Sequence, residues 1–287
     1  MIIQAIGRTI EIGDRPLLMG VVNVTPDSFF DGGRYATTDA AVAQALRLME
    51  EGADLLDIGA ESTRPGSESV DAREEIHRLI PVVTAVAKAV GIPISVDTMK
   101  STVARAALEA GAVIVNDVSA LRNDPVMAEV IATTGAGVVL MHMQGTPKTM
   151  QVDPVYGDVV GEVADFFRER LKFCSGQGIG QSQIVLDPGI GFGKLLLHNL
   201  TLLGQLESFS TYDRPILVGV SMKAFIGQIL DRPVDGRSWG TAAAVAVAVR
   251  HGAGILRVHD VATMKEVVTM AAAITRHSGV PERTQHA

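Results

Sequence analysis

An aspartate followed by three alternating glycines marks the stretch VLDPGIGFGK, residues 185–194. The apolar run Ile184–Leu186 leads into it and predicts a buried strand that ends at Asp187. Because glycines leave backbone N–H groups uncovered, another molecule can approach such a loop closely. A carboxylate at the end of a buried strand, followed by such a loop, is a common ligand site in α/β proteins. Taken alone, the stretch is explained equally well as a tight strand-to-helix turn that needs glycine.

The same alternation of an apolar run and a helical segment recurs along the chain. The eight strand-like runs are Leu17–Val24, Leu55–Ile58, Pro93–Val96, Val113–Asn116, Gly137–Met141, Ile184–Leu186, Pro215–Val220 and Gly254–Val258. The helical segments are Asp39–Glu51, Ala72–Val90, Ser101–Glu109, Pro125–Thr133, Asp158–Cys174, Leu196–Leu206, Arg237–His251 and Thr263–Thr275. Continuous apolar strands alternating with helices predict an α/β fold with a parallel sheet, and eight such units predict a TIM (β/α)8 barrel. A doubly wound open sheet fits less well, because no Gly-x-Gly-x-x-Gly follows the first strand.

The whole chain, residues 1–287, is expected to form one barrel domain. One such barrel takes roughly 250 residues, and the chain is 47% hydrophobic but only 4% aromatic. Alternation from Ile2 to Ile12 around Gly7-Arg8 predicts a short β-hairpin within residues 1–13, ahead of the barrel. The polar residues 279–287 are expected to be a flexible tail.

Composition narrows the classes of function. The net charge is −7 and no basic run occurs, which argues against a nucleic-acid or acidic-membrane partner. The single cysteine, Cys174, excludes an internal disulfide and a cysteine metal cluster, and it suits a reducing cytoplasm. Residues 1–8 are too polar for a signal peptide, and the longest apolar run, 242–249, is far shorter than the ~20 residues that span a bilayer. We therefore expect a soluble cytoplasmic protein.

Every predicted strand delivers a polar group to its carboxyl end, where barrels of this kind carry their chemistry. The groups are, in chain order, 23–33 with Asn23 first, 57–66 with Asp57 first, Asp97, Asn116 with Asp117, His142 with Gln144, Asp187, Ser221 with Met222 and Lys223, and Arg257 with His259 and Asp260. Buried polar groups are costly unless they are satisfied, so stability alone does not require this arrangement. Single members have structural explanations of equal weight, namely Asp57, Asp117, His142 and Ser221.

The types of these residues indicate the chemistry of the ligand. Asp97, Asn116 and Asp187 suit the N–H edge of a flat heterocycle, and one carboxylate can accept two parallel hydrogen bonds from it. Lys223 and Arg257 can neutralise ring oxygens or stack on the ring.

The same rim offers groups for an anion. Arg64, His259 and the N–H-rich loops suit a phosphate or pyrophosphate. The spacings Asp54-x-x-Asp57 and Asp27-x-x-x-Asp31 lack a full ligand set for a metal. A Mg²⁺ ion shared with a bound pyrophosphate is the better prediction.

Several motifs in this chain together resemble the dihydropteroate synthase family. They are NVTPDSF (23–29), ESTRPG (61–66), HMQGTP (142–147) with TMQ (149–151), DPGIGFGK (187–194) and RVHDV (257–261). The resemblance implies a TIM barrel of folate biosynthesis, usually a homodimer. It also implies condensation of 6-hydroxymethyl-7,8-dihydropterin pyrophosphate with p-aminobenzoate, with Mg²⁺ and release of pyrophosphate, and a role as sulfonamide target.

Carried onto this sequence, the resemblance assigns each motif residue a role. Asp97, Asn116, Asp187 and Lys223 would hold the pterin with Arg257 stacked on it, and Asn23 would help to hold Mg²⁺. His259, Arg257, Thr63 and Arg64 would contact the pyrophosphate, and Phe29, Arg64, Pro65, Phe192 and Ser221 would form the p-aminobenzoate site. Asp97, Lys223, Arg257 and Arg64 would be the catalytic residues. The step would be SN1-like, with no protein nucleophile.

Two departures from the family pattern stand out. Met222 occupies the place of the usual arginine in Ser-Arg-Lys, and Leu195–Leu197 replace a polar helix start that includes a glutamate. The four pterin-holding residues remain, so we expect activity to remain. Two alternatives stay open: a methyltetrahydrofolate-dependent corrinoid methyltransferase, which would not need the motifs at 27–29 and 63–65, and a barrel paralogue that has lost turnover.

Overall fold

The computed structural model describes residues 1–24, 33–63 and 66–277, with side chains of the first helix described from residue 38 onward. Eight parallel strands form the central sheet: β3 (Leu17–Asn23), β4 (Leu55–Gly59), β5 (Ile94–Asp97), β6 (Ile114–Asp117), β7 (Gly137–Met141), β8 (Ile184–Asp187), β9 (Leu217–Val218) and β10 (Ile255–Val258). Their order in space is β8-β7-β6-β5-β4-β3-β10-β9. A parallel bridge between Leu186 and Ile216 brings the two edge strands together. The predicted TIM barrel is therefore confirmed, and the open-sheet alternative is wrong.

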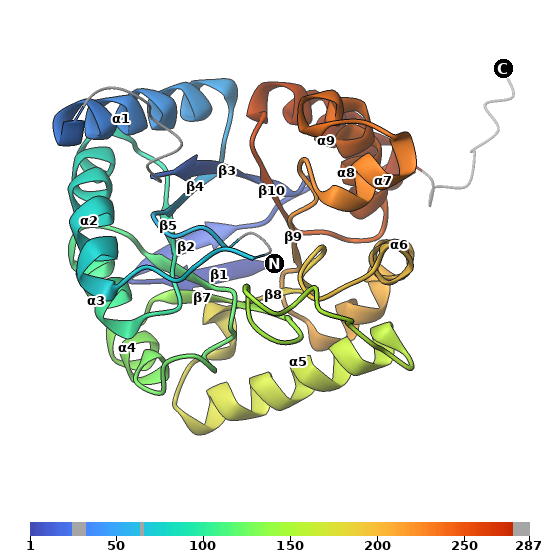
Figure 1. Cartoon of the computed structure of the whole chain (residues 1–287), viewed down its shortest axis with the longest axis horizontal. Coiled ribbons are helices and arrows are strands. Elements are labelled where there is room, and N and C mark those ends of the chain that lie inside the picture. Colours follow the sequence, from blue (N-terminus) through green and yellow to red (C-terminus); the bar gives the residue numbers. More distant parts are fainter. Residues whose placement is uncertain (25–32, 64–65, 278–287) are drawn as a thin grey trace, which may run out of the picture.

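Helices surround the strands (Figure 1). They are α1 (Gly33–Glu51), α2 (Ala72–Ala89), α3 (Ser101–Glu109), α4 (Met127–Thr134), α5 (Val159–Gly176), α6 (Leu196–Gly204), α7 (Ala224–Leu230), α8 (Ser238–Arg250) and α9 (Val261–His277). Short 3-10 turns, η2 (Gln181–Gln183), η3 (Leu206–Tyr212) and η4 (Val234–Gly236), complete the order. Helix α7 was not predicted, because its seven residues are too short for the apolar spacing to show. Strand β9 is shorter than the predicted run Pro215–Val220, although Ile216, just before it, still forms a bridge with Leu186.

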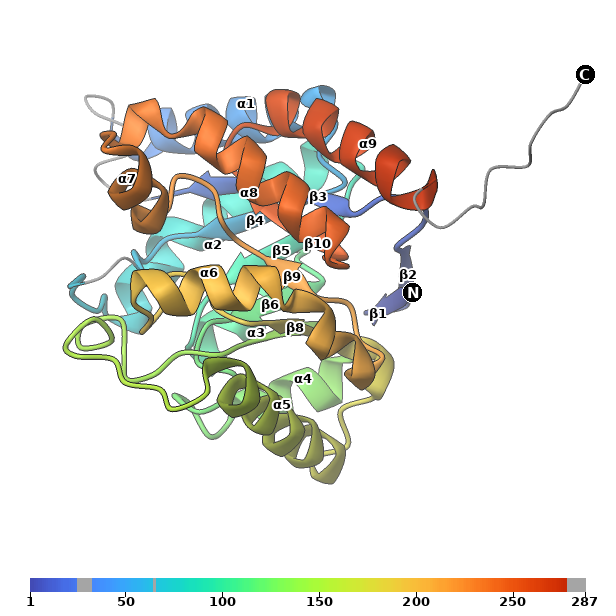
Figure 2. The ribbon, with the colours of Figure 1, turned by 90° about the vertical axis from the view of Figure 1, so that its right-hand side faces the viewer.

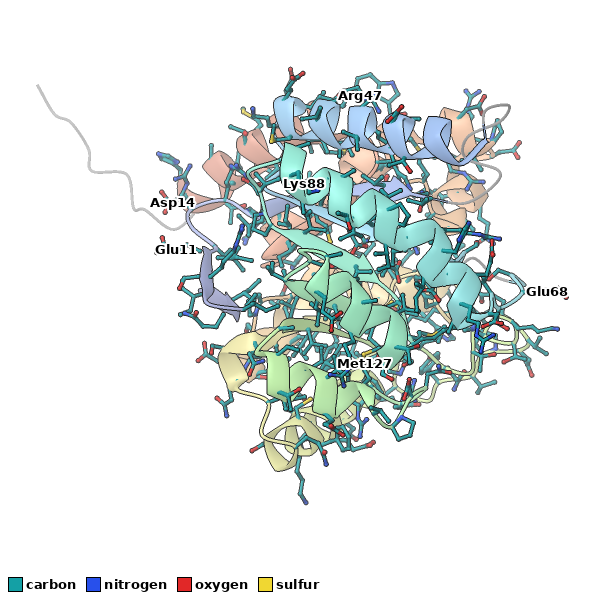
Figure 3. All side chains as sticks on the ribbon, turned by 90° about the vertical axis from the view of Figure 1, so that its left-hand side faces the viewer. Glu11, Asp14, Arg47, Glu68, Lys88 and Met127 are labelled. Carbon is teal, nitrogen blue, oxygen red and sulfur yellow. The ribbon has the colours of Figure 1, made fainter. Side chains whose placement is uncertain are left out.

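The N-terminal hairpin closes one end of the barrel. Strands β1 (Ile2–Ala5) and β2 (Arg8–Glu11) pair antiparallel, as predicted. Their inward residues Ile3, Ala5 and Ile10 pack on the first residues of several barrel strands. Figures 2 and 3 show the hairpin at one end of the barrel, while Figure 3 places Glu68 of the second βα loop at the other end.

The main core lies between the strands and the helices. It is built from aliphatic side chains, with Phe167 and Phe209 the largest that are fully buried. The strands contribute side chains to this layer and to the barrel interior alternately, which is why their sequences read as continuous apolar runs. Among the described residues, no helix is long and apolar enough to cross a membrane.

Candidate active site

The strand register puts the polar residues at one level of the barrel mouth. Asn23 of β3 lies beside Gly59 of β4, Gly59 beside Asp97 of β5, and Asp97 beside Asn116 of β6. A Cβ atom at Gly59 would come within 3.2 Å of the Cβ atom of Asp97, so glycine keeps the space beside this carboxylate open. The register therefore gathers residues that are up to 93 positions apart in the sequence.

Arg257 joins these carboxylates into one group. Its Nε donates to Asp57 Oδ2 at 2.6 Å, and its Nη2 donates to Asp97 Oδ2 at 3.2 Å. Asn116 Nδ2 donates to the same oxygen of Asp57 at 3.0 Å. Asp57 thus orients both the amide and the guanidinium that the sequence assigned to the ligand. Its role was left undecided by the sequence, although a carboxylate inside an apolar strand, which needs a cationic partner, was the available sign.

Three buried oxygen atoms in this group have no hydrogen-bond partner within the described part of the chain: Asp57 Oδ1, Asp97 Oδ1 and Ser95 Oγ. Ser95 lies beside Asp57 in the register. Buried polar atoms are nearly always paired in proteins, so unpaired acceptors that gather in one place indicate a ligand that donates hydrogen bonds.

Burial and mutual charge shift the protonation of the site. Burial raises the pKa of Asp97 to about 7, with a further rise from the Asp57 carboxylate and an opposing effect of Arg257. Burial also raises the pKa of Asp187 to about 6, against the Gly189 N–H and the charge of Lys223. The pKa of Lys223 falls to about 8, because the amine is buried and Arg257 is near. Shifted pKa values concentrated among neighbouring residues are typical of a functional site.

The glycine loop after β8 is built around Asp187 and packed tightly. Gly189 N–H donates to Asp187 Oδ1 at 2.7 Å. Gly189 has φ +68°, and a Cβ atom there would lie 1.9 Å from the carbonyl oxygen of His142. Lys194 Nζ, almost fully buried, donates to the carbonyl oxygens of His142 at 3.3 Å and Phe192 at 2.9 Å. The loop is thereby tied to the loop after β7.

The loop also brings an aromatic ring to Lys223. Lys223 Nζ lies 4.1 Å from the centroid of the Phe192 ring, a cation–π distance. Gly191 approaches the Lys223 side chain so closely that an added Cβ atom would be 3.1 Å from Lys223 Cδ. The Lys223 ammonium therefore lies directly against the Phe192 ring.

Ser221 and His259 form a second contact at the same end. His259 Nδ1 lies 2.9 Å from Ser221 Oγ. Both residues follow neighbouring strands, β9 and β10. Asn23 is half-buried at the end of β3, and Thr63 is half-buried in the loop after β4. The predicted residues Phe29, Arg64 and Pro65 lie outside the described residues.

Two residues with open roles in the sequence are structural. Asp117 accepts hydrogen bonds from Ser119 N, Ser119 Oγ and Leu121 N, and so caps the turn after β6. The His142 ring packs edge-on against Phe166 at 4.9 Å, and its Nδ1 lies 2.9 Å from Lys194 Nζ. Burial and the nearby cations lower the pKa of His142 to about 2, so this ring stays neutral.

The sequence model of the family described as "Pterin binding enzyme" matches residues 19–259. Dihydropteroate synthase from Synechocystis is 44% identical over 273 residues, which cover 94% of this chain and 94% of that protein. This chain belongs to the dihydropteroate synthase family. The resemblance seen in the motifs is confirmed.

Solved dihydropteroate synthases have the same fold over their whole length. That from Yersinia pestis, in complex with a sulfonamide drug, has a TM-score of 0.90 at 42% identity and covers 96% of this chain and 100% of its own. That from Xanthomonas albilineans, with 4-aminobenzoic acid, has a TM-score of 0.89 at 44% identity and covers 98% and 100%. These relatives are synthases, so the methyltransferase alternative has no support.

The departure from the family pattern at Met222 changes the local contacts. The Met222 carbonyl oxygen accepts from Arg237 Nη1 at 3.0 Å, and its sulfur lies 3.9 Å from Thr241 Oγ1. A guanidinium thus still lies beside position 222, but it comes from the turn before α8. The chain keeps the charged groups Lys223 and Arg257 near Asp187 and Asp97.

Proposed function

We propose that this protein condenses 6-hydroxymethyl-7,8-dihydropterin pyrophosphate with p-aminobenzoate to give 7,8-dihydropteroate and pyrophosphate. The unpaired buried oxygens of Asp57, Asp97 and Ser95 carry this proposal, because a pterin ring offers N–H donors to such acceptors. Asp187 supplies a carboxylate at the same rim, to which the edge of the ring can donate two parallel hydrogen bonds.

The residues divide the work between binding and charge stabilisation. Asp187, Asn116 and Lys223 hold the pterin, and Arg257 lies beside it, fixed by its bonds to Asp57 and Asp97. The bond between the exocyclic carbon and the pyrophosphate oxygen breaks, and its electron pair leaves with the pyrophosphate. Asp97 stabilises the positive charge that develops on the dihydropterin. The arylamine nitrogen then forms the new bond to this carbon and releases one proton to solvent, so no protein nucleophile is needed.

The remaining predicted residues surround the leaving group and the second substrate. His259 and Thr63, with Arg64, contact the pyrophosphate. Ser221 and Phe192, with Phe29 and Pro65, form the p-aminobenzoate side. A sulfonamide, which resembles p-aminobenzoate, competes there.

Mg²⁺ is proposed as the metal of this reaction. Within the described residues no group of three His, Cys, Asp or Glu side chains could hold a metal. Asn23 offers one amide oxygen at the rim, and Mg²⁺ commonly takes one or two protein oxygens together with substrate phosphates and water. The Asn23 amide oxygen and the substrate phosphates together fit such a shared ion. When bound, Mg²⁺ would neutralise charge on the departing pyrophosphate.

A pyrophosphate-release assay tests the proposed reaction. Purified protein with both substrates and Mg²⁺ is expected to release pyrophosphate and form dihydropteroate, and a sulfonamide is expected to slow this release. Asp187→Asn serves as the control, because an amide puts a donor where the ring also donates. A wild-type protein that releases no pyrophosphate contradicts the proposal and supports the paralogue without turnover.

We also propose that the protein acts in the cytoplasm as a homodimer. Eight of the sixteen large apolar side chains that are exposed in the described residues lie between 195 and 247, on α6, α7, η4 and α8. They are Leu195, Leu197, Leu200, Ile229, Leu230, Val234, Trp239 and Val247. These elements contact one another and form one side of the barrel, which Figure 2 shows facing the viewer. We call these eight residues the apolar face, and a second copy of the chain would cover it.

The apolar face gives the second departure from the family pattern a function. Leu195 and Leu197 are exposed, with 72% of Leu197 accessible. Leu196 packs against the core, whereas Leu195 and Leu197 do not, and their place in an interface between two copies would explain them. The buried thiol of Cys174 fits the proposed reducing compartment.

A further inference from the structure

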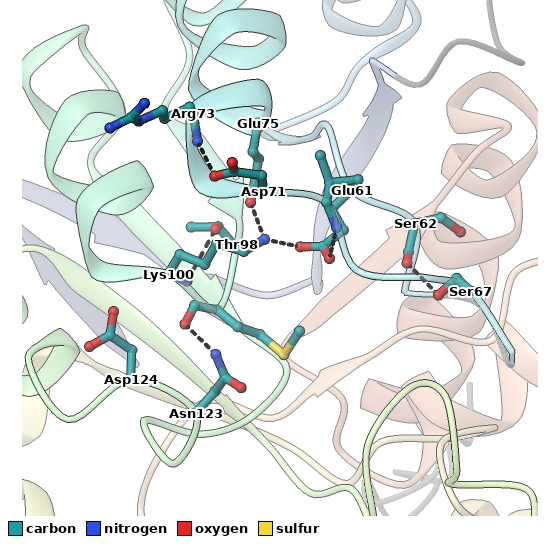
Figure 4. Close-up of polar contacts among 12 residues, drawn as sticks. Glu61, Ser62, Ser67, Asp71, Arg73, Glu75, Thr98, Lys100, Asn123 and Asp124 are labelled. Atoms are coloured by element: carbon teal, nitrogen blue, oxygen red, sulfur yellow. Dashed lines mark hydrogen bonds and ion pairs between the residues drawn. The ribbon is translucent and has the colours of Figure 1, made fainter.

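A second charged cluster lies beside the site and joins two neighbouring βα units, β4–α2 and β5–α3 (Figure 4). Lys100 Nζ, after β5, lies 2.5 Å from Glu61 Oε2 and 2.6 Å from Glu75 Oε2. Glu61 follows β4, and Glu75 lies in the first turn of α2. The Glu75 side chain is fully buried, and those of Glu61 and Lys100 are 6% and 19% exposed. Such sheltered charge-assisted bonds are stronger than surface pairs.

Glu61 also closes the loop that begins with it. Its other carboxylate oxygen, Oε1, accepts the backbone N–H of Val70 at 2.9 Å. Ser67 Oγ donates to the carbonyl oxygen of Ser62 at 2.6 Å inside the same segment. One carboxylate thus joins the start of the segment 61–70, its end, and Lys100. Gly66 N–H, within this segment, donates to the carbonyl oxygen of Pro147 at 3.1 Å.

The position of Lys100 links this loop to the pterin site. Lys100 is three residues after Asp97, and its backbone N–H donates to Thr98 Oγ1 at 3.3 Å. The ion pair between Glu61 and Lys100 therefore fixes the start of the loop after β4 relative to the segment that carries Asp97. The loop contains Thr63, which contacts the pyrophosphate in the proposed reaction.

We propose that Glu61 and Lys100 are positioning residues, which hold Thr63 in place for the pyrophosphate of the pterin substrate. The inference rests on the proposed function. Glu75 has a different part: it balances the charge of Lys100 from the helix side, and its carboxylate makes no hydrogen bond to the described residues of the loop. The two carboxylates on one ammonium are therefore not equivalent, and this difference makes the proposal testable.

Two isosteric variants separate the roles. Glu61→Gln retains an oxygen for Val70 N–H but loses the attraction to Lys100, and Glu75→Gln leaves the Lys100–Glu61 pair intact. We expect Glu61→Gln to raise the KM for the dihydropterin pyrophosphate about tenfold or more, since small displacements of a positioned group lower rates strongly. The Kd for a pterin without pyrophosphate, measured by calorimetry, should change less than threefold. Glu75→Gln should leave the KM for the dihydropterin pyrophosphate within threefold of wild type.

A third measurement does not depend on activity. Hydrogen exchange at the Val70 amide should be faster in Glu61→Gln, because a neutral amide oxygen accepts this N–H more weakly than a carboxylate does. It should be unchanged in Arg78→Met, which removes an ion pair on α2 outside the cluster. A folded Glu61→Gln protein with wild-type KM for the dihydropterin pyrophosphate, or with an equal loss of affinity for the pterin without pyrophosphate, overturns the positioning role. Absence of turnover in the wild type would instead overturn the proposed function, while the exchange rates would still report the contact of Glu61 with Val70.

Discussion

Asp57 shows how much one buried carboxylate can organise. It is fully buried and accepts hydrogen bonds from Arg257 and Asn116, and its other oxygen has no partner among the described residues. Removing its charge should leave Arg257 with a single acidic partner and the Asn116 amide without an anchor. Breaking a buried ion pair destabilises proteins by roughly 3–5 kcal/mol, so the loss should lower the stability of the fold. It should also lower ligand affinity, because Arg257 and Asn116 would no longer be held in place.

We therefore expect Asp57→Asn to lower pterin affinity at least tenfold and to destabilise the fold by a few kcal/mol, about the cost of a broken buried pair. Asp54→Asn is the matched control. Asp54 pairs with Arg15 at 2.7 Å near the start of β3, away from the mouth, so stability should fall while pterin affinity stays unchanged. Calorimetry and urea unfolding measure the two effects. Equal loss of pterin affinity in both variants would show that Asp57 acts through stability alone.

The pKa values of the site predict a narrow pH range for pterin binding. Asp187 and Asp97, with pKa values of about 6 and about 7, must be ionised to accept hydrogen bonds from the ring. Hydrogen-bond donors of the ligand favour the ionised carboxylates and so lower both pKa values. Binding therefore releases protons below about pH 7, and the affinity falls as the pH falls. Lys223, with a pKa of about 8, loses its charge at higher pH, and binding should weaken there too.

Calorimetry from pH 5 to pH 9 checks this expectation. The affinity should be highest between about pH 7 and pH 8, and buffers of different ionisation enthalpy should reveal proton release at pH 6. An affinity that stays constant from pH 5 to pH 8 would mean that neither carboxylate contacts the ring.

In the glycine loop after β8, close backbone contacts determine where a residue with a side chain can be accommodated. Gly189 and Gly135 have nearly the same φ, +68° and +69°. An added Cβ atom at Gly135, which caps α4, meets nothing within 4 Å, whereas at Gly189 it would lie 1.9 Å from the His142 carbonyl oxygen. The two positions therefore share the conformational strain of a left-handed residue and differ in the steric clash.

Gly135→Ala should cost about 1 kcal/mol of stability, the usual penalty for a left-handed alanine. Gly189→Ala should cost about 1–3 kcal/mol more because of overpacking, and it should also weaken pterin binding by moving Asp187. Urea unfolding of both variants gives the difference. Equal destabilisation would show that the loop can shift away from His142 without loss.

The helices and strands show how much of the fold could be predicted from the sequence. The eight strands and most helix positions follow from apolar runs and helical spacing, because those patterns reflect burial on the two sides of each strand. The residues at the strand ends were likewise predictable, since a parallel barrel brings them together. The bonds of Asp57 and the Glu61–Lys100–Glu75 cluster were not, because they depend on register between strands and on side-chain directions that no local pattern encodes.

The apolar face is expected to be the interface between the two copies of the dimer. Trp239 is 85% exposed within it. Trp239→Glu should convert the dimer to monomers in sedimentation velocity, because a charge would be buried against a second copy. Val152→Glu is the control: this residue is 78% exposed but lies on the loop after β7. A wild-type protein that sediments as a monomer would contradict the homodimer, as would an unchanged dimer in Trp239→Glu.

The hairpin that closes the bottom of the barrel has a consequence for how the chain acquires its structure. Ile3 and Ile10 pack against β9 and β10 residues such as Leu217 and Ile255, and β3 pairs with β10, more than two hundred residues later. At a synthesis rate of roughly 5–20 residues per second, the first segment waits many seconds for these partners. Native contacts of such long sequence separation slow folding. The barrel is therefore expected to close in one late, cooperative step after the last strand leaves the ribosome. The N-terminal hairpin, which is synthesised first, would pack against the barrel only in this step.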